Sequence, residues 1–298
     1  MPSDAASLDA LFRETVAAID AGDVAAVARL TKEHPRLVRD RLKAPGAWLR
    51  DKVAGALKGF FKKPYLLWFV AEDPVRNDTL PKNIADIART IIEAAKRERV
   101  DTLQEQLDYA LRLVAWSWVA HRCGVQLELI DVLVDAGASP NGVPDDALVN
   151  HHFAAAERLV ERGAEMTLAT ALSLGRWDDA VRLAQSTSTR DKQFALTLTA
   201  LNGRAEALVR LIQTGAVDIN AVSRDLYSHA SPLHHAVCSG SLDAVKVLVQ
   251  AGAKLTAKDS VHRATPLGWA EYYEGEQKDA DARRRYGDIA AYLRERST

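Results

Sequence analysis

The sequence predicts an all-α protein built from a row of two-helix hairpins. Apolar residues recur at i, i+3 and i+4 spacing along the chain, while the alternation typical of β-strands is almost absent. A short helical segment, a glycine and a second helical segment follow one another repeatedly. This glycine falls at Gly22, Gly124, Gly175, Gly203 and Gly240. Because one hairpin cannot bury its own apolar face, stacking consecutive hairpins gives the continuous core of a solenoid.

The second helices of the hairpins share one template. They read VAAVARL, ELIDVLV, DDAVRLA, EALVRLI and DAVKVLV, and the segments IADIARTII and AAAERLV fit without the preceding glycine. Four of them end in a Gly-Ala pair, at Gly137, Gly163, Gly215 and Gly252. Glycine at this position turns the chain with a positive φ at little cost. The interval from Gly175 to Gly203 is shorter than the interval from Gly203 to Gly240, so we expect the connections to differ in length.

Two first helices carry a specific motif. SPLHHA (residues 231–236) and ATPLGWA (residues 264–270) resemble the T-P-L-H-x-A signature of ankyrin repeats. The resemblance is good from Val125 to the C-terminus and strongest over residues 215–270. It implies an ankyrin solenoid, a fold that typically binds other proteins. The chain also resembles bacterial ankyrin-repeat domain proteins to which no activity is attached.

The resemblance implies a role for each residue of the first motif. Ser231 should cap the helix through its hydroxyl, and Pro232 suits the first helical position, where no N–H is needed. Leu233 should face the stack, and His234 should brace neighbouring turns through hydrogen bonds. One repeat later the same roles fall to Thr265, Pro266 and Leu267, with Gly268 in place of the histidine.

The N-terminal part departs from the repeat pattern. IDAGDVAAVARLTKEHP fits a first repeat, and YLLWFVA (residues 65–71) resembles a degenerate first helix paired with IADIARTIIEAA. Residues 36–63 match no repeat, which indicates an insertion or a capping element. YGDIAAYLRERST reads as a polar-faced terminal cap. We therefore expect degenerate repeats with a basic insertion in residues 1–124, and ankyrin repeats with a capping helix in residues 125–298.

Composition excludes several classes of protein. The 298 residues carry a formal net charge of -1, which argues against a protein whose overall charge attracts nucleic acid. No apolar run is long enough for a membrane span, and the N-terminus lacks the features of a signal peptide. Two cysteines, Cys123 and Cys238, are too few for a disulfide framework. We expect a cytoplasmic monomer with no cofactor and no small-molecule substrate.

The histidines raise the question of a metal or catalytic site. His234 and Cys238 lie four residues apart and could share a helix face. Two ligands do not complete a tetrahedral site, and the role implied by the repeat accounts for His234 without a metal. No partner that could orient a nucleophilic Cys238 is visible at useful spacing. His151 and His152 fall at a turn between helices, where adjacent side chains diverge, so we interpret them as polar turn residues.

A contact surface is predicted from the family pattern. Cys238 and Ser239 occupy the variable end of a first helix facing the groove, and Tyr272 and Tyr273 match them one repeat later. Tyrosine suits interfaces because it offers a large contact area at low entropic cost. The adjoining hairpin tips add further candidates: Tyr227, His229, His262 and Arg263. Individually these could be scattered surface residues; together they form the candidate partner-binding set.

Residues 36–63 combine positive charge with an apolar stripe. Leu49, Val53, Leu57 and Phe60 fall at helical spacing beside basic residues that outnumber Asp40 and Asp51: Arg36, Arg39, Arg41, Lys43, Arg50, Lys52, Lys58, Lys62 and Lys63. The stripe could pack on the first repeats and leave the lysines solvated. Alternatively the segment could meet an acidic partner, an anionic membrane or nucleic acid. Gly55 and Gly59 weaken an isolated helix by about 1 kcal/mol each, which favours a helix held by packing.

Tryptophans in first helices could suggest an aromatic cage, but their positions favour packing between repeats. We expect Trp68, Trp116 or Trp118, and Trp269 to be core or half-buried. The sequence thus predicts a non-catalytic module that binds a partner protein through the groove and hairpin tips. Two alternatives stay open: an enzyme whose site carries no recognisable motif, and a membrane or nucleic-acid binder that acts through residues 36–63.

Overall fold

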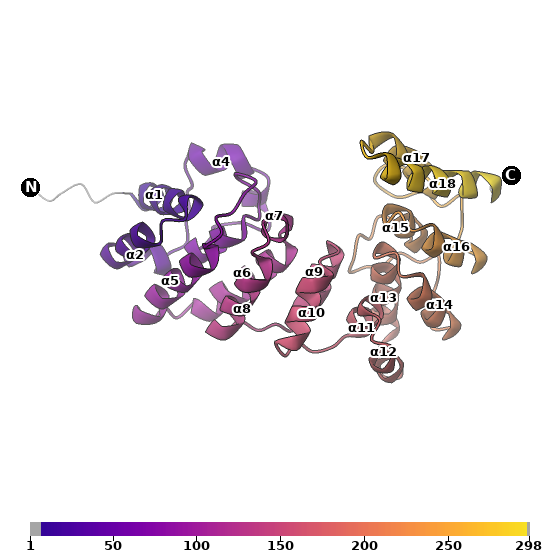
Figure 1. Cartoon of the computed structure of the whole chain (residues 1–298), viewed down its shortest axis with the longest axis horizontal. Coiled ribbons are helices and arrows are strands. Elements are labelled where there is room, and N and C mark those ends of the chain that lie inside the picture. The colour runs from indigo at the N-terminus through magenta and orange to yellow at the C-terminus, as the bar shows by residue number, and fades with distance from the viewer. Residues whose placement is uncertain (1–6, 297–298) are drawn as a thin grey trace, which may run out of the picture. The chain divides into compact units, whose positions relative to one another are not determined.

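The computed structural model of the chain describes residues 7–296, and these residues form helices and no β-strand (Figure 1). Contacts divide the chain into two compact units, Met1–Glu165 (unit 1) and Met166–Thr298 (unit 2). This division separates the two parts of the chain that make most of their contacts internally. The division predicted after residue 124 instead separates degenerate repeats from regular ones. The predicted division therefore stays a prediction.

Unit 1 contains ten α-helices and two 3-10 helices within the described range. Their bounds are α1 Leu8–Ala21, α2 Val24–Glu33, α3 Arg36–Arg39, α4 Ala47–Val53, η1 Ala56–Lys58, η2 Leu66–Ala71, α5 Ile84–Arg97, α6 Leu103–Trp116, α7 Trp118–Arg122, α8 Gln126–Ala136, α9 Val143–Val149 and α10 Phe153–Glu161. The helices stack in two layers. First helices α1, η2, α6 and α9 contact one another in sequence, and second helices α2, α5, α8 and α10 do the same.

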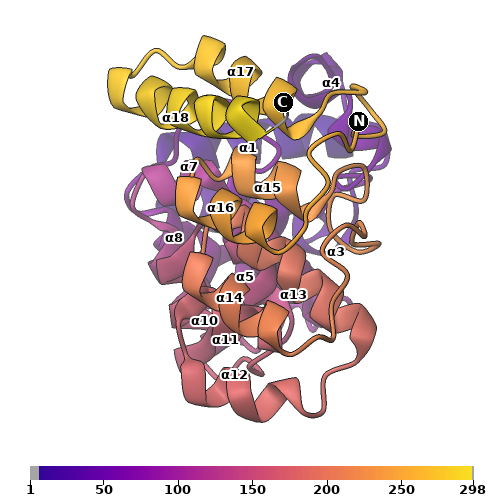
Figure 2. The same cartoon turned by 90° about the vertical axis from the view of Figure 1, so that its right-hand side faces the viewer.

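Unit 2 repeats this arrangement with eight helices in its described residues. Their bounds are α11 Leu168–Leu174, α12 Trp177–Ala184, α13 Thr189–Leu201, α14 Ala205–Gln213, α15 Pro232–Cys238, α16 Leu242–Gln250, α17 Pro266–Glu276 and α18 Ala280–Arg296. First helices α11, α13, α15 and α17 pack in order, and α14, α16 and α18 form the second layer. Figure 2 shows α17 and α18 side by side, with α15 and α16 in the preceding hairpin.

The core lies between the two helix layers of each unit. In unit 1 the buried face of α5 includes Ile87 and Ile91, and in unit 2 Leu233 and Leu248 are almost completely buried. Burying one such side chain contributes about 1.5–3 kcal/mol, so the stacked hairpins stabilise one another far more than helix propensity does. The predicted inward orientation of Leu233 is confirmed. Leu267, its counterpart in α17, is only half-buried.

The predicted glycine turns join the two helices of a hairpin, and the turn at Gly203 lies against the next hairpin. Gly203 has a φ of +64°, and a Cβ added there would lie 2.8 Å from Cβ of Ser241 and 3.0 Å from Oγ of Ser239. Any larger residue would be strained in its backbone and would also collide with the next hairpin. The glycine therefore fixes how closely the turn after α13 approaches the turn after α15.

YLLWFVA takes the place of a first helix, as its sequence predicted, and forms the 3-10 helix η2 between α1 and α6. One other local prediction needs correction. Trp116 and Trp118 are exposed because they lie at the junction of α6 and α7, outside the layer where first helices stack. The expected burial is correct for Trp68, which is in the core, and for the half-buried Trp269.

The basic segment is less regular than the predicted amphipathic helix. Its main helix α4 ends at Val53, and the apolar stripe splits, with Leu49 and Val53 buried while Phe60 is half exposed. The glycines at 55 and 59 lower helix propensity where the helix stops. Packing of the first half of the stripe supports the interpretation of the segment as a structural insertion.

Candidate functional site

The motif around His234 joins two hairpins. Ser231 is the N-cap of α15, and both its backbone N–H (3.3 Å) and its hydroxyl (2.8 Å) lie within hydrogen-bond distance of His234 Nδ1. On its other side, Nε2 lies 3.2 Å from the carbonyl oxygen of Ala264. A carbonyl can only accept, so Nε2 carries the proton and Nδ1 is the acceptor. Burial lowers the pKa of His234, and the neutral ring braces the next repeat as the sequence predicted.

Asp259 organises the hairpin tip that precedes α17. Its carboxylate is buried and accepts hydrogen bonds from the backbone N–H groups of Val261 (2.9 Å), His262 (2.6 Å) and Ala264 (3.0 Å). The indole Nε1 of Trp269 donates a fourth bond, at 3.1 Å. Burial raises the pKa of the Asp259 carboxyl, but these hydrogen bonds outweigh burial and hold its pKa far below the usual value. The tip is thus held rigidly around one ionised carboxylate.

A pocket of about 420 Å³ opens between this tip and α17. Its aromatic and imidazole side chains, here called the tyrosine–histidine surface, are His229, His262, Trp269, Tyr272 and Tyr273. The backbone N–H of Ser260 donates to the carbonyl of His229 at 2.8 Å, which ties one tip to the next. Tyr272 is 63% exposed and contacts Tyr273 edge-on, with ring centroids 5.6 Å apart. The surface therefore presents a large aromatic side chain beside a preformed hollow.

Tyr273 is held in place by three elements. Its ring stacks on Tyr286 of α18 at 5.2 Å, and it meets Trp269 edge-on at 6.2 Å. Its hydroxyl lies 3.4 Å from Sγ of Cys238, and the hydroxyl of Tyr286 donates to the Cys238 carbonyl at 2.9 Å. Burial raises the pKa of the Cys238 thiol, although the Tyr273 hydrogen bond partly opposes it, and burial also raises the pKa of Tyr273. Cys238 is thus a protonated packing residue.

The other predicted contact residues lie around this surface. Tyr227 has a positive φ, is 41% exposed, and stacks on His235 with ring centroids 5.9 Å apart. Burial is the main cause that lowers the pKa of His235, to about 4. Ser239 stabilises the turn after α15, since its hydroxyl donates to the Ala236 carbonyl (2.7 Å) and accepts from the Ser241 backbone N–H (3.1 Å). Arg263 is exposed at a left-handed position and does not line the pocket.

The structure thus brings His229, His262, Tyr272 and Tyr273 to one pocket, with Cys238 in contact with Tyr273. Trp269 was expected only to pack, and its part in lining the pocket could not be read from the sequence. Asp259 was missed altogether. An Asp two residues before a polar tip segment is a signal for an Asx-type turn, which could have found it.

Several of the remaining candidates are engaged within the protein. In the basic segment Arg36 pairs with Asp40, Arg39 with Glu98, and Arg41 with Glu105. His152 is buried, with Nδ1 3.0 Å from the Ala115 carbonyl and 3.0 Å from the Gln126 amide, while His151 is a turn residue with positive φ. Over residues 7–296, no cluster of three or more His, Cys, Asp or Glu side chains is arranged to hold a metal. Nor is any helix in that range long and apolar enough to cross a membrane.

Comparison with known proteins agrees with the repeat architecture. The sequence profile described as "Ankyrin repeats (3 copies)" matches residues 150–259, which span α10 to α16. Among solved structures, the human ASB11 ankyrin repeat domain is similar, with 14% identity over 66% of this chain and 92% of that one, and a TM-score of 0.33. No curated protein sequence matches the chain. The profile match shows that residues 150–259 form ankyrin repeats, and the His234 brace and the two-layer stacking of hairpins agree with this.

Proposed function

We propose that unit 2 binds a partner protein through the tyrosine–histidine surface and the adjoining side chains of Tyr227, Cys238, Ser239 and Arg263. Ankyrin repeats are generally protein–protein interaction modules. The observation that carries the proposal is the pocket of about 420 Å³ beside the exposed Tyr272. A partner's apolar side chain would fill the hollow while Tyr272 folds over it, which is how interfaces concentrate their affinity in a few aromatic anchors.

The chemistry of this surface favours binding over turnover. Two buried polar groups beside it, His234 and Asp259, have their hydrogen-bonding atoms engaged by the chain itself. Burial raises the pKa of Cys238, which keeps its thiol in the weakly nucleophilic form. What the surface offers to a partner is shape, aromatic area and imidazole hydrogen bonds, all held on a preorganised tip.

Tyr272→Ala tests the proposal cleanly, because Tyr272 is exposed whereas Tyr273 packs against its neighbours. Proteins from a lysate of the native cell are captured on the full chain and identified by mass spectrometry. We expect the partner to be lost with Tyr272→Ala, since removing a central aromatic anchor costs about 2 kcal/mol or more of binding free energy. The melting temperature should stay nearly unchanged.

Val181→Ala is the matched control, because Val181 is equally exposed on α12 and lies outside the pocket. The captured partner should bind this variant as it binds the natural chain. A partner whose dissociation constant is the same for the natural chain and Tyr272→Ala would show that the tyrosine–histidine surface is not the binding site.

A further inference from the structure

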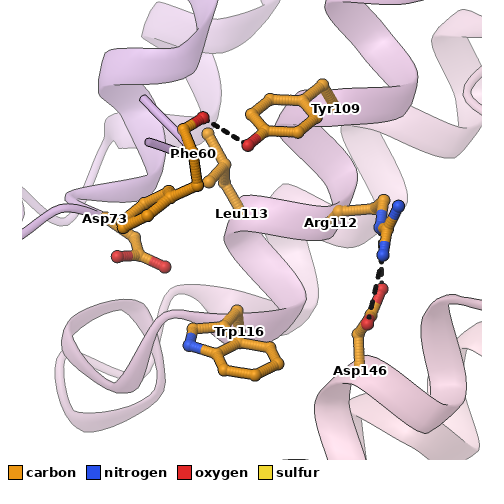
Figure 3. Close-up of a pocket in the computed structure, with 7 residues that line it drawn as sticks. All are labelled: Phe60, Asp73, Tyr109, Arg112, Leu113, Trp116 and Asp146. Atoms are coloured by element: carbon orange, nitrogen blue, oxygen red, sulfur yellow. Dashed lines mark hydrogen bonds and ion pairs between the residues drawn. The ribbon is translucent and has the colours of Figure 1, made fainter. Parts of the chain in front are cut away.

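A second pocket lies within unit 1, whereas the residues of the proposed partner surface all belong to unit 2. Its volume is about 410 Å³, and it is formed by the loop that follows η1, the turn after η2, and helices α6 and α9. Figure 3 shows Phe60 and the Asp73 carboxylate on one side of the pocket and the Arg112–Asp146 ion pair on the other. The side chains of Tyr109 and Trp116 complete the lining.

Three aromatic rings give this pocket its character. Phe60 is 50% exposed and Trp116 is 38% exposed, so both present ring surface to solvent. Tyr109 is fixed by two contacts, because its hydroxyl donates to the Phe60 carbonyl and its ring lies 4.4 Å from that of Trp68. Aromatic ring faces carry negative electrostatic potential, and a cation within about 6 Å of a ring centroid is attracted to them.

The Asp73 carboxylate is the second element of the pocket. It is half-buried, and none of residues 7–296 donates a hydrogen bond to it or pairs with it. Burial, with a smaller contribution from the negative charge of Glu72, raises the pKa of Asp73 to about 6. A carboxylate that has lost part of its hydration without gaining a hydrogen-bond donor is stabilised when a cationic donor approaches it.

The only guanidinium in the lining does not cancel this charge. Arg112 is committed to Asp146, with Nε 2.8 Å from Oδ2 and the second nitrogen 3.4 Å from Oδ1. The lining therefore holds two carboxylates against one guanidinium, and its unmatched charge lies on Asp73 beside the rings. An anionic ligand would meet both this carboxylate and the negative ring faces.

Unit 1 already pairs cations with aromatic rings elsewhere. The guanidinium of Arg41 lies 4.2 Å from the centroid of Tyr65, and that of Arg122 lies 4.5 Å from the centroid of Trp118. No comparable cation of the described residues covers Phe60, Tyr109 or Trp116. The rings of the pocket are thus open to a cation that comes from outside the chain.

We propose that this pocket binds the side chain of a lysine presented by a partner protein, with its ammonium group between the Asp73 carboxylate and the aromatic rings. The aliphatic stem of a lysine would lie along Leu113 and the rings, as long cationic side chains do at apolar surfaces. An ammonium suits a single carboxylate better than a guanidinium does, because its donors rotate freely and need no paired acceptor oxygens.

The test is a titration of the isotope-labelled full chain, followed by amide and indole NMR signals. The probes are n-butylammonium, N-acetyl-lysine amide, the uncharged n-butanol, and the anion butyrate. We expect both ammonium probes to shift the Trp116 indole signal in a saturable way. Their affinity should exceed that of n-butanol by about tenfold, the size of a cation–π contact combined with one carboxylate.

Variants separate the two halves of the site. Asp73→Asn keeps the shape and should lower affinity for both ammonium probes by about fivefold or more without affecting n-butanol. Phe60→Leu keeps an apolar wall without a ring and should weaken the ammonium probes by a smaller factor. Asp51→Asn is the matched control, because Asp51 is an exposed carboxylate of α4 outside the pocket. The amide spectrum of each variant shows that it is folded.

Acidification supplies an independent readout. Affinity for the ammonium probes should fall as pH drops through about 6, because protonation removes the negative charge of Asp73. The charged and titratable groups that face Asp73 are Glu72 on its own turn, Tyr109 and Arg112 from α6, and Asp146 from α9. Asp73→Asn should abolish the step, which assigns it to this carboxyl.

Several results would overturn the proposal. Equal affinity for n-butanol, tighter binding of butyrate, or unchanged binding to Asp73→Asn would each show that the pocket does not select a cation. Binding of n-butylammonium without binding of N-acetyl-lysine amide would show that the pocket takes a free small amine, and the assignment to a partner's lysine would fail.

Discussion

At the scale of single residues, buried polar groups set the shape of the surfaces that the repeats expose. Asp259 gathers the hairpin tip through its four hydrogen bonds, and His234 links that tip to α15. The role of His234 could be predicted because the ankyrin motif that SPLHHA resembles carries a bracing histidine at this position. The role of Asp73 could not, because its pocket forms only when a loop, a turn and two helices come together.

Asp259→Asn should destabilise unit 2 at neutral pH, because the amide NH2 of asparagine would face N–H groups that now donate to a carboxylate oxygen. The pKa of Asp259 is held below that of the unfolded chain, so its contribution is present above about pH 4 and is lost as the pH falls further. The difference in free energy of unfolding between the natural chain and Asp259→Asn should therefore shrink in acid. Denaturant titrations at neutral pH and near pH 3 measure it. A difference that is independent of pH would contradict the ionised role of Asp259.

At the scale of elements, an inner first helix is stabilised by its two neighbours in the layer. α15 packs between α13 and α17, and its inward Leu233 is 1% exposed. The apolar spacing and the Ser-Pro or Thr-Pro starts of α15 and α17 were enough to predict these helices. They could not predict that η2 winds as a 3-10 helix, since that depends on the packing of its six buried residues against α5 and α6.

Leu233→Ala should cost about 2–5 kcal/mol of unfolding free energy, because it leaves a cavity between stacked first helices. Leu267→Ala, at the matched position of the next repeat, should cost clearly less because Leu267 is only half-buried. Chemical denaturation of both variants gives the comparison. Equal losses, or a loss within a few tenths of a kcal/mol for Leu233→Ala, would contradict the packing described for α15.

At the scale of the whole molecule, stability is a sum over neighbouring hairpins. Unit 2 has its own two-layer core from α11 to α18, and its apolar faces meet within the unit. The all-α solenoid and its repeat boundaries could be predicted from periodicity because contacts are local in sequence. The side chains at the tips could be named, but not the pocket they share, since loop geometry decides which of them converge.

Residues 166–298 expressed alone should fold into a helical, cooperatively melting unit, since stacked repeats need only their neighbours. Far-UV circular dichroism and a thermal scan of this fragment check the expectation. The tyrosine–histidine surface should survive in the fragment, so the partner captured by the full chain should bind it too. A fragment that is unfolded in buffer would show that unit 2 draws its stability from beyond its own hairpins.

The close approach at Gly203 separates what can vary in this architecture from what cannot. A larger residue at the Gly203 turn would push adjacent hairpins apart. The loops between hairpins, in contrast, already differ in length: the loop between α14 and α15 is far longer than the one between α12 and α13. We therefore expect insertions and deletions to be tolerated in the loops between hairpins and to be disruptive at the Gly203 turn. Remodelling of these loops would then change binding specificity without changing the spacing between stacked hairpins.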